Sequence, residues 1–431
     1  MSPKNHLRNV KWLNQVAYKA SPKKRVTPQL LRPVVYHPRC SNWVALEDSN
    51  GQSLMSGSVL KVVSWNINWS SAGIEARATA VLEHLQELFG EIQDPFVVML
   101  QEVCRESLQT ILQNPWVQRN FVLSDTKAPE SLYTNLPGAG DSITLKRLDW
   151  RAMPYSSVIM VSRNLAIENC FRVPFVTEMG RDALVVDIPI SNSREQTEPE
   201  ECLRLCTTHL ESLWSGKAYR AGQLRLISAL LKGLPMDPIV KSRIRAGLVG
   251  GDMNAIDPAE HEIHRTTDVD LKDTWDVSAP QIPDVKLSGK DLSYGRARGN
   301  TWGYQSDKSR PGKRSGKRLD KFLYTGPIEL VAPAQAQDVT GRIGRLGIGL
   351  KTEVDVWEHE TVEMHMEQGK MINKIHKEYV SDDTAATWRD GGFPGYKQLV
   401  RTKISAWVSD HFGIVVSVKV LGERLEGLGE S

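Results

Sequence analysis

The segment AGLVGGDMNAIDP, residues 246–258, ends an apolar run in two glycines and then places a carboxylate and a carboxamide two positions apart, at Asp252 and Asn254. In an extended chain, residues i and i+2 point to the same side, so both side chains would face one space at the edge of a sheet. That space would suit a water molecule and a phosphate. A glycine turn is the simpler alternative for this segment alone, because Gly, Asn and Asp are common turn residues.

Polar residues of the same kinds stand at the ends of other apolar runs. They are Asn66 after VVSW, Glu102 after VVMLQ, His209 and Ser212 in LCTTHLES, Asp320 in RLDKFLY, and Asp410 and His411 in WVSDHFG. Each one alone could be a cap, a turn or a satisfied polar residue at the end of a strand. Together with Asp252 and Asn254, these carboxylates, amides and imidazoles predict a metal and phosphate site.

The elements that must position these residues are short apolar strands and two amphipathic helices. Strands are expected at 59–65, 96–100, 156–161, 183–188, 203–208, 246–250, 318–324 and 413–420. Apolar residues at helical spacing predict helices over 74–89 and 217–233. Many strands with few intervening helices favour an α/β fold of two packed sheets with helices on the outside.

The composition is that of an ordinary soluble globular protein, with 40% hydrophobic and 24% charged residues in a chain of 431. The net charge of +3 gives no global field that would indicate a nucleic-acid or membrane partner. No apolar run is long enough to span a membrane, and the polar, basic N-terminus does not resemble a signal peptide. Five scattered cysteines suggest free thiols in a reducing compartment. We therefore expect an intracellular protein of the nucleus or cytoplasm that is not secreted.

The chain divides into three parts on composition. The composition of residues 1–57 predicts a basic, flexible extension. Its cluster SPKKRVTP at 21–28 is either a nuclear localisation signal or a solvated tail. Residues 58–420 are expected to form one domain with insertions at about 124–154 and 331–405, because strands resume on each side of both. Residues 421–431 are a C-terminal tail.

The ordered series WN, QEV, THL, GDxN, LD and SDH resembles the endonuclease/exonuclease/phosphatase superfamily. The resemblance covers residues 58–420 and implies a four-layered α/β sandwich, two packed mixed β-sheets with helices on the outside. It also implies a divalent metal and an active site at one end of the two sheets.

The resemblance assigns a role to each matching residue, and the chemistry of each side chain agrees. Glu102 would be the main ligand of Mg²⁺, with Mn²⁺ as an alternative ion, because a hard cation that keeps several waters needs few protein oxygens. Asn66 would hold a metal-bound water, and Asp410 would add a metal contact through water.

The remaining matching residues would act on the attacking water and the phosphate. Asp252 would orient and deprotonate the water, and Asn254 would hold this water or a phosphate oxygen. His209 and His411 would donate to the non-bridging oxygens, where charge must be stabilised, and Asp320 would fix the tautomer of His411. No residue is an obvious covalent nucleophile, so direct attack by water is the simplest mechanism.

The local sequence is most similar to the 5′-tyrosyl-DNA phosphodiesterase branch. In that branch the residues matching Arg181 and Ser212 contact phosphate, and the one matching Trp302 lines the DNA groove. The chain departs from the branch at WNINW and at Ile256, where the branch has an arginine. The same chemistry on RNA, lipid or inositol phosphates therefore stays open. A catalytically silent scaffold is disfavoured, because the whole set of catalytic residue types is present.

A basic stretch before Asp320 would add to a nucleic acid groove. Residues 296–321 place Trp302 and Tyr304 beside several cations, and aromatic rings next to cations suit single-stranded nucleic acid. The cations assigned to substrate binding are Lys313, Arg314, Lys317 and Arg318. A solvated surface loop is the alternative for this stretch.

Overall fold

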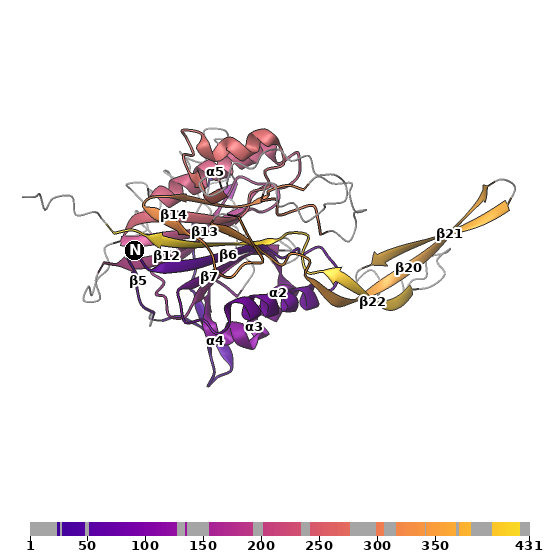
Figure 1. Cartoon of the computed structure of the whole chain (residues 1–431), viewed down its shortest axis with the longest axis horizontal. Helices are drawn as coiled ribbons and strands as arrows, with labels where there is room; N and C mark the ends of the chain where they lie inside the picture. Colours follow the sequence, from indigo (N-terminus) through magenta and orange to yellow (C-terminus); the bar gives the residue numbers. More distant parts are fainter. Residues whose placement is uncertain are drawn as a thin grey trace, which may run out of the picture.

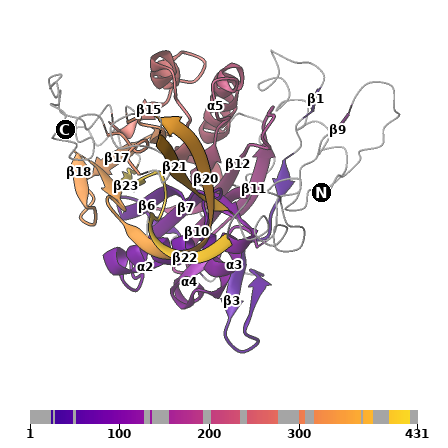
Figure 2. The same ribbon diagram turned by 90° about the vertical axis from the view of Figure 1, so that its right-hand side faces the viewer.

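The computed structural model describes residues 24–25, 28–47, 51–126, 134–135, 155–192, 201–233, 242–275, 299–305, 316–340, 342–367, 370–380 and 399–422. Within these residues two large sheets lie face to face, with helices on both outer sides (Figures 1 and 2). The expected insertion at 124–154 and the tail at 421–431 lie mostly outside the described residues.

The first sheet has ten strands. In spatial order they are β18 (Asp338–Thr340), β19 (Ile343–Leu346), β23 (Gly413–Val420), β6 (Val59–Asn66), β7 (Phe96–Cys104), β10 (Tyr155–Ser162), β8 (Phe121–Leu123), β3 (Val34–His37) and β4 (Asn42–Ala45), and β17 (Ile328–Val331) also pairs with β23. Strands β6 and β7 are parallel, whereas β23 runs antiparallel to β6.

The second sheet has eight strands. In spatial order they are β15 (Lys272–Asp273), β16 (Asp320–Thr325), β14 (Arg243–Asp252), β13 (Glu201–His209), β12 (Asp182–Ser191), β11 (Asn169–Pro174) and β2 (Gln29–Leu30), and β5 (Leu54–Met55) pairs with β12. Strands β13 and β14 are parallel, and β16 is antiparallel to β14. A separate pair joins β1 (Lys24–Arg25) to β9 (Thr134–Asn135).

Helices complete the four layers. Helices α2 (Ile74–Phe89), α3 (Arg105–Gln113) and α4 (Pro115–Asn120) pack on the outer face of the first sheet, and α5 (Lys217–Lys232) and the 3₁₀ helix η1 (Pro258–Arg265) cover the second (Figure 1). Apolar side chains from both sheets, including Val62, Met99, Leu205 and Phe322, form the core between them. The expected four-layered α/β sandwich is confirmed.

The register of the strands brings the polar strand ends together. His209 pairs with Asp252 across β13 and β14, and Asp252 pairs with Asp320 across β14 and β16. In the other sheet Asn66 pairs with Gln101, one residue before Glu102. Asn66, His209 and Asp252 end their strands, Asp320 begins its strand, and Glu102 lies two residues before the end of β7, so the packed sheets present all of them at one edge.

The two glycines before Asp252 are required by close packing. A Cβ atom on Gly251 would lie 1.9 Å from Thr208 O, and one on Gly250 would lie 2.4 Å from the ring of Phe322. Both distances are far below van der Waals contact, so only glycine allows β14 to lie against β13 and the Phe322 ring of β16 at this point.

Part of the expected N-terminal extension belongs to the sandwich. Strands β2, β3, β4 and β5 all lie before residue 58 and add edges to the two large sheets. The expectation of a flexible extension over 1–57 is therefore wrong for these strands. They are two to four residues long, too short to show a hydrophobic period.

The described residues of the expected insertion at 331–405 are largely β-structure. Its first part supplies β18 and β19 to the ten-stranded sheet. Its second part forms an arm of three antiparallel strands, β20 (Lys351–Glu367), β21 (Lys370–Val380) and β22 (Leu399–Trp407), which projects from the body (Figure 1). The base of the arm packs on α2, where Val354 meets Ala72 and Ala76.

The five cysteines are all free; Cys40 is exposed and the other four are buried. Among the described residues, no helix is both long and apolar enough to cross a membrane.

Candidate active site

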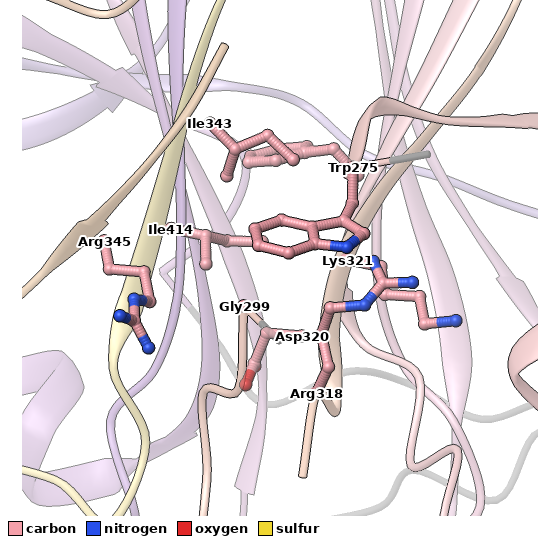
Figure 3. Close-up of a pocket in the computed structure, with 9 residues that line it drawn as sticks. Trp275, Gly299, Arg318, Asp320, Lys321, Ile343, Arg345 and Ile414 are labelled. Carbon is pink, nitrogen blue, oxygen red and sulfur yellow. The ribbon is translucent and has the colours of Figure 1, made fainter. Parts of the chain in front are cut away.

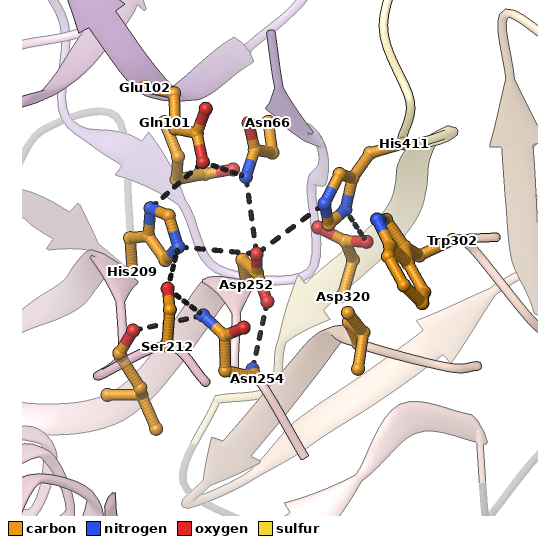
Figure 4. Close-up of polar contacts among 12 residues, drawn as sticks. Asn66, Gln101, Glu102, His209, Ser212, Asp252, Asn254, Trp302, Asp320 and His411 are labelled. Carbon is orange, nitrogen blue, oxygen red and sulfur yellow. Dashed lines mark hydrogen bonds and ion pairs between the residues drawn. The ribbon is translucent and has the colours of Figure 1, made fainter. Parts of the chain in front are cut away.

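The carboxylate of Asp252 lies at the centre of the polar cluster (Figure 4). Its Oδ2 atom accepts a hydrogen bond from Asn66 Nδ2 at 3.2 Å and lies 3.4 Å from His209 Nε2 and 3.7 Å from His411 Nε2. Its Oδ1 atom accepts a hydrogen bond from the backbone N–H of Asn254 at 2.8 Å. Burial is the main cause that raises the pKa of Asp252, to about 6.

Glu102 lies on the opposite side of Asn66. Asn66 Nδ2 donates to Glu102 Oε1 at 3.2 Å, and the backbone N–H of Trp69 donates to Oε2 at 3.1 Å. Burial and the charge of Asp410 raise the pKa of Glu102 to about 7.

These carboxylates fit a hard divalent cation. The carboxyl groups of Asp252, which is buried, and of Glu102, which is partly buried, both have raised pKa values and are bridged by one carboxamide, so they form an oxygen-rich site. Such a donor set matches the oxygen ligands of Mg²⁺ or Mn²⁺. Asp252, Asp320 and His411 also approach one another closely enough to hold an ion, but the imidazole of His411 is already paired with Asp320.

His411 is held between two carboxylates. Its Nδ1 atom lies 2.8 Å from Asp320 Oδ2, and Asp320 and His411 are both buried. Burial alone would lower the pKa of His411, but Asp320, Asp252 and Asp410 together raise it well above the ordinary value. His411 therefore carries a positive charge at neutral pH.

Asp320 also lines a small pocket behind the site (Figure 3). Arg318, Lys321 and Arg345 also line this pocket, but each is paired with another carboxylate: Arg318 and Lys321 with Asp273, and Arg345 with Asp338.

His209 has the opposite protonation state to His411 and is neutral. Burial, Arg181 and His411 lower the pKa of His209 well below its ordinary value. Arg181 Nη1 lies 3.0 Å from Nδ1 of this ring, and because arginine can only donate, Nδ1 accepts and the proton is on Nε2. The neutral His209 ring therefore directs its N–H toward Asp252 and the space beside it.

Arg181 and Ser212 meet next to His209. Arg181 Nη2 donates to Ser212 Oγ at 2.7 Å, and Asn254 Nδ2 lies 3.2 Å from the same oxygen. The Arg181 guanidinium also stacks over the ring of Tyr155, 5.0 Å from its centroid. Arg181, Ser212 and Asn254, which are distant in sequence, form one polar wall.

Trp302 and Asp410 form the opposite side of the site. Trp302 Nε1 donates to Asp410 Oδ2 at 3.1 Å, so Asp410 anchors the indole at the edge of the catalytic cluster. Lys317 pairs with Trp302 through the backbone, and its ammonium donates to Ile256 O at 3.0 Å.

Arg318 does not lie at the mouth of the site, in contrast to its expected role in substrate binding. Its guanidinium makes two hydrogen bonds to buried Asp273, at 3.0 and 2.6 Å, and stacks on Trp275. Consecutive residues of an extended chain point to opposite sides, so Lys317 and Arg318 cannot both face the site. Lys313 and Arg314 lie outside the described residues.

Three residues that help to form the candidate site were not identified from the sequence. Trp69 and Tyr155 stack with ring centroids 4.9 Å apart and form an aromatic wall beside Glu102. Glu211 accepts hydrogen bonds from Thr177 Oγ1 and from the N–H groups of Glu178 and Met179, which fixes the loop that carries Arg181. Only Glu211, next to the histidine motif, had a signal in the sequence; the aromatic pair depends on long-range packing.

Comparison with known proteins agrees with this geometry. The model of the Endonuclease/Exonuclease/phosphatase family matches residues 63–411. The chain belongs to this family. It is a hydrolase that acts on phosphoester bonds. A search of curated proteins by sequence gave no match.

Several solved structures resemble this family member. TDP2 from Caenorhabditis elegans is 15% identical, with a TM-score of 0.46 over 84% of this chain and 76% of that chain. TDP2 from D. rerio, complexed with a single-strand DNA product, is 17% identical, with a TM-score of 0.46 over 84% and 99%. The human Nocturnin catalytic domain with bound sulfate is 13% identical, with a TM-score of 0.40 over 84% and 94%.

Proposed function

We propose that this protein is a Mg²⁺-dependent phosphodiesterase that hydrolyses ester bonds at the ends of nucleic acid strands or at adducts on them, such as 5′-tyrosyl DNA. The observation that carries the proposal is the position of Asp252, a carboxylate surrounded by the donors of Asn66, His209 and His411. This arrangement suits one base that acts on water and several groups that bind a phosphate.

Asp252 is the base that orients the attacking water and takes its proton. Its pKa of about 6 makes it a stronger base than an ordinary aspartate while leaving it ionised at neutral pH. Asn254 holds the loop after Asp252 in place, because its N–H donates to Asp252 and its amide bonds Leu210 O and Ser212 Oγ.

The phosphate is bound by donors on both sides of Asp252. The charged imidazole of His411, kept protonated by Asp320, stabilises negative charge on one non-bridging oxygen. The neutral His209 donates from Nε2, and Arg181 and Ser212 add a cation and a hydroxyl. Preorganised donors of this kind stabilise the transition state because they need not reorient during the reaction.

Glu102 would hold the metal ion, with Asn66 and Asp410 beside it. When bound, the ion supplies positive charge that polarises the phosphoryl oxygen and helps the leaving oxygen depart. Trp69 and Tyr155 shield Glu102 from solvent on one side.

The arrangement favours a leaving group that needs no proton. His411 is the charged imidazole among the described residues of the site, but it lies 3.7 Å from Asp252, on the side of the attacking water. In-line displacement puts the leaving oxygen on the opposite side. A tyrosine phenol, with a pKa of about 10, leaves readily as phenolate, whereas a sugar alkoxide would need an acid.

The rim of the site suits a nucleic acid strand. Trp302 is held by Asp410, and Lys317 lies beside it. An aromatic ring next to a cation offers a stacking surface for a base and a partner for a phosphate.

The test compares kcat/KM on three substrates in the presence of Mg²⁺: an oligonucleotide with a 5′-phosphotyrosyl end, the same oligonucleotide without the adduct, and an abasic duplex. We expect fastest cleavage of the tyrosyl end, leaving a 5′-phosphate, and no cleavage in EDTA. Preference for either other oligonucleotide would remove the tyrosyl-DNA assignment. Preference for sphingomyelin or inositol phosphates, tested in parallel, would contradict the nucleic acid assignment.

A further inference from the structure

The turn between β13 and α5 exposes two large apolar side chains next to the candidate site. Leu213 is 63% exposed and Trp214 is 64% exposed. They directly follow Ser212, whose hydroxyl bonds Arg181 and Asn254. Because two residues span at most about 7 Å of chain, the Trp214 backbone lies close to the phosphate-binding wall.

Hydrogen bonds from Arg220 fix the backbone of this turn. Arg220 Nη1 donates to Glu211 O at 2.8 Å and to Leu213 O at 2.9 Å, and buried Glu260 holds the same guanidinium through two hydrogen bonds of 2.7 and 3.0 Å. Gly216 completes the turn, since a Cβ atom there would lie 2.3 Å from Ser212 O. The exposure of Leu213 and Trp214 is therefore built into the turn.

Leu213 adopts a backbone conformation that glycine would adopt with less strain. Its φ angle is +62°, in the left-handed region, which is strained for a residue with a side chain. Glu102 and Asn254, which also have positive φ angles, belong to the candidate site, whereas Ser41 and Asp270 do not. Strained backbone of this kind is typical of functional sites, and here it keeps an apolar side chain in solvent.

A cation accompanies the exposed indole. Lys217 Nζ lies 5.3 Å from the centroid of the Trp214 ring and 2.5 Å from Asp257 Oδ2, three residues after Asn254. On the other side of this loop, Lys317 contacts Ile256 O and pairs with Trp302. The loop after Asn254 is thus flanked by two pairs, each made of a tryptophan and a lysine.

We propose that Trp214 stacks on a nucleobase next to the scissile phosphodiester, with Leu213 packing against the same base and Lys217 facing a phosphate of the strand. This inference rests on the proposed function and adds a base-binding position to it. A flat indole beside a cation binds any base through its π face, so the position selects for a strand with bases and not for a sequence.

The experiment measures binding by fluorescence anisotropy in an Asp252→Asn background with Mg²⁺. Two single-stranded probes are compared: one with normal thymine bases and one with abasic residues at the nucleotides nearest the 5′ end. We expect Trp214→Ala to weaken binding of the base-bearing probe by about 5- to 100-fold. Binding of the abasic probe should change little, and Trp214→Phe should retain most of the affinity.

Leu30→Ala is the matched control for Leu213→Ala, because Leu30 is 61% exposed on β2. We expect only Leu213→Ala to weaken binding of the base-bearing probe. If Trp214→Ala weakened binding of both probes equally, or of neither probe, the inference would be overturned.

Hydrolysis by the protein with Asp252 intact separates this inference from the proposed function. If the oligonucleotides are cleaved but Trp214→Ala binds both probes normally, only the base-stacking position is wrong. If no oligonucleotide is cleaved but base-dependent binding through Trp214 is present, the proposed reaction is wrong and the base-stacking position stands.

Discussion

His411 Nδ1 lies 2.8 Å from Asp320 Oδ2, and both groups are buried. The pair holds one proton on the side of the imidazole away from Asp252, so His411 can present a second N–H to the reacting phosphate. The chemistry of the site depends on this pairing because a neutral imidazole would stabilise less negative charge.

Asp320→Asn should leave the fold intact and lower the rate. An amide cannot hold the His411 proton as a carboxylate does, so the pKa of His411 should fall and the charged form should be lost at neutral pH. We expect about a 10- to 100-fold loss in kcat, the scale found for residues that orient a catalytic imidazole. The measurement is kcat against pH, together with thermal unfolding. A variant that is only less stable, with normal activity per folded molecule, would make Asp320 structural.

Glu102→Gln should weaken the binding of Mg²⁺ at the site. A neutral amide is a much poorer ligand for a hard cation than a carboxylate, so activity should require a far higher Mg²⁺ concentration. Titration of activity with Mg²⁺ tests this, with Glu106→Gln as the control, because Glu106 is exposed on nearby α3. An unchanged titration in the Glu102 variant would move the metal to other ligands.

The stabilisation of the fold by Mg²⁺ should depend on pH. The folded pKa values of Glu102 and Asp252, about 7 and 6, are raised above the ordinary values of 4.5 and 3.8. The stability from these groups is therefore fully present below the ordinary values and is lost as pH rises through about 7. Mg²⁺ would bind the deprotonated carboxylate of Glu102, so the gain in Tm on adding Mg²⁺ should be larger at about pH 8 than at about pH 5.5. Equal gains at both pH values would contradict these shifts.

Lys317→Ala and Arg318→Ala should have different effects although the residues are neighbours. Lys317→Ala should weaken oligonucleotide binding and reduce the log–log salt slope by about 0.7 to 0.9 for one lost phosphate contact. Arg318→Ala should lower Tm, because removing one partner of a buried ion pair costs about 3–5 kcal/mol. Salt titrations of binding and thermal unfolding of both variants test this. The reverse pattern would place Arg318 in the groove.

The site residues at strand ends could be predicted because the pairing of neighbouring strands places them next to one another. Once β13, β14 and β16 pair in register, His209, Asp252 and Asp320 must lie side by side, and the residue types alone indicate their chemistry. Arg318 was misplaced because a run of cations does not show which face of the chain each one occupies.

Other features depend on contacts between distant segments. The stacking of Trp69 on Tyr155 needs β10 to lie beside β7, which the local sequence does not show. The arm formed by β20, β21 and β22 had a short signal, since Val354 and Val356 alternate with charged residues and are buried. The charged residues along the rest of the arm hide that alternation in the sequence.

The most direct test of the proposed mechanism is the rate of Asp252→Asn on the preferred substrate with saturating Mg²⁺. Asp252 lies at the centre of the donors from both sheets, so no other described carboxylate is placed to act as the base. We predict that kcat falls by about 10²- to 10⁴-fold, the scale for loss of a general base, while substrate affinity and Tm change little. A variant that keeps most of its kcat would contradict the assignment of Asp252 as the group that activates water.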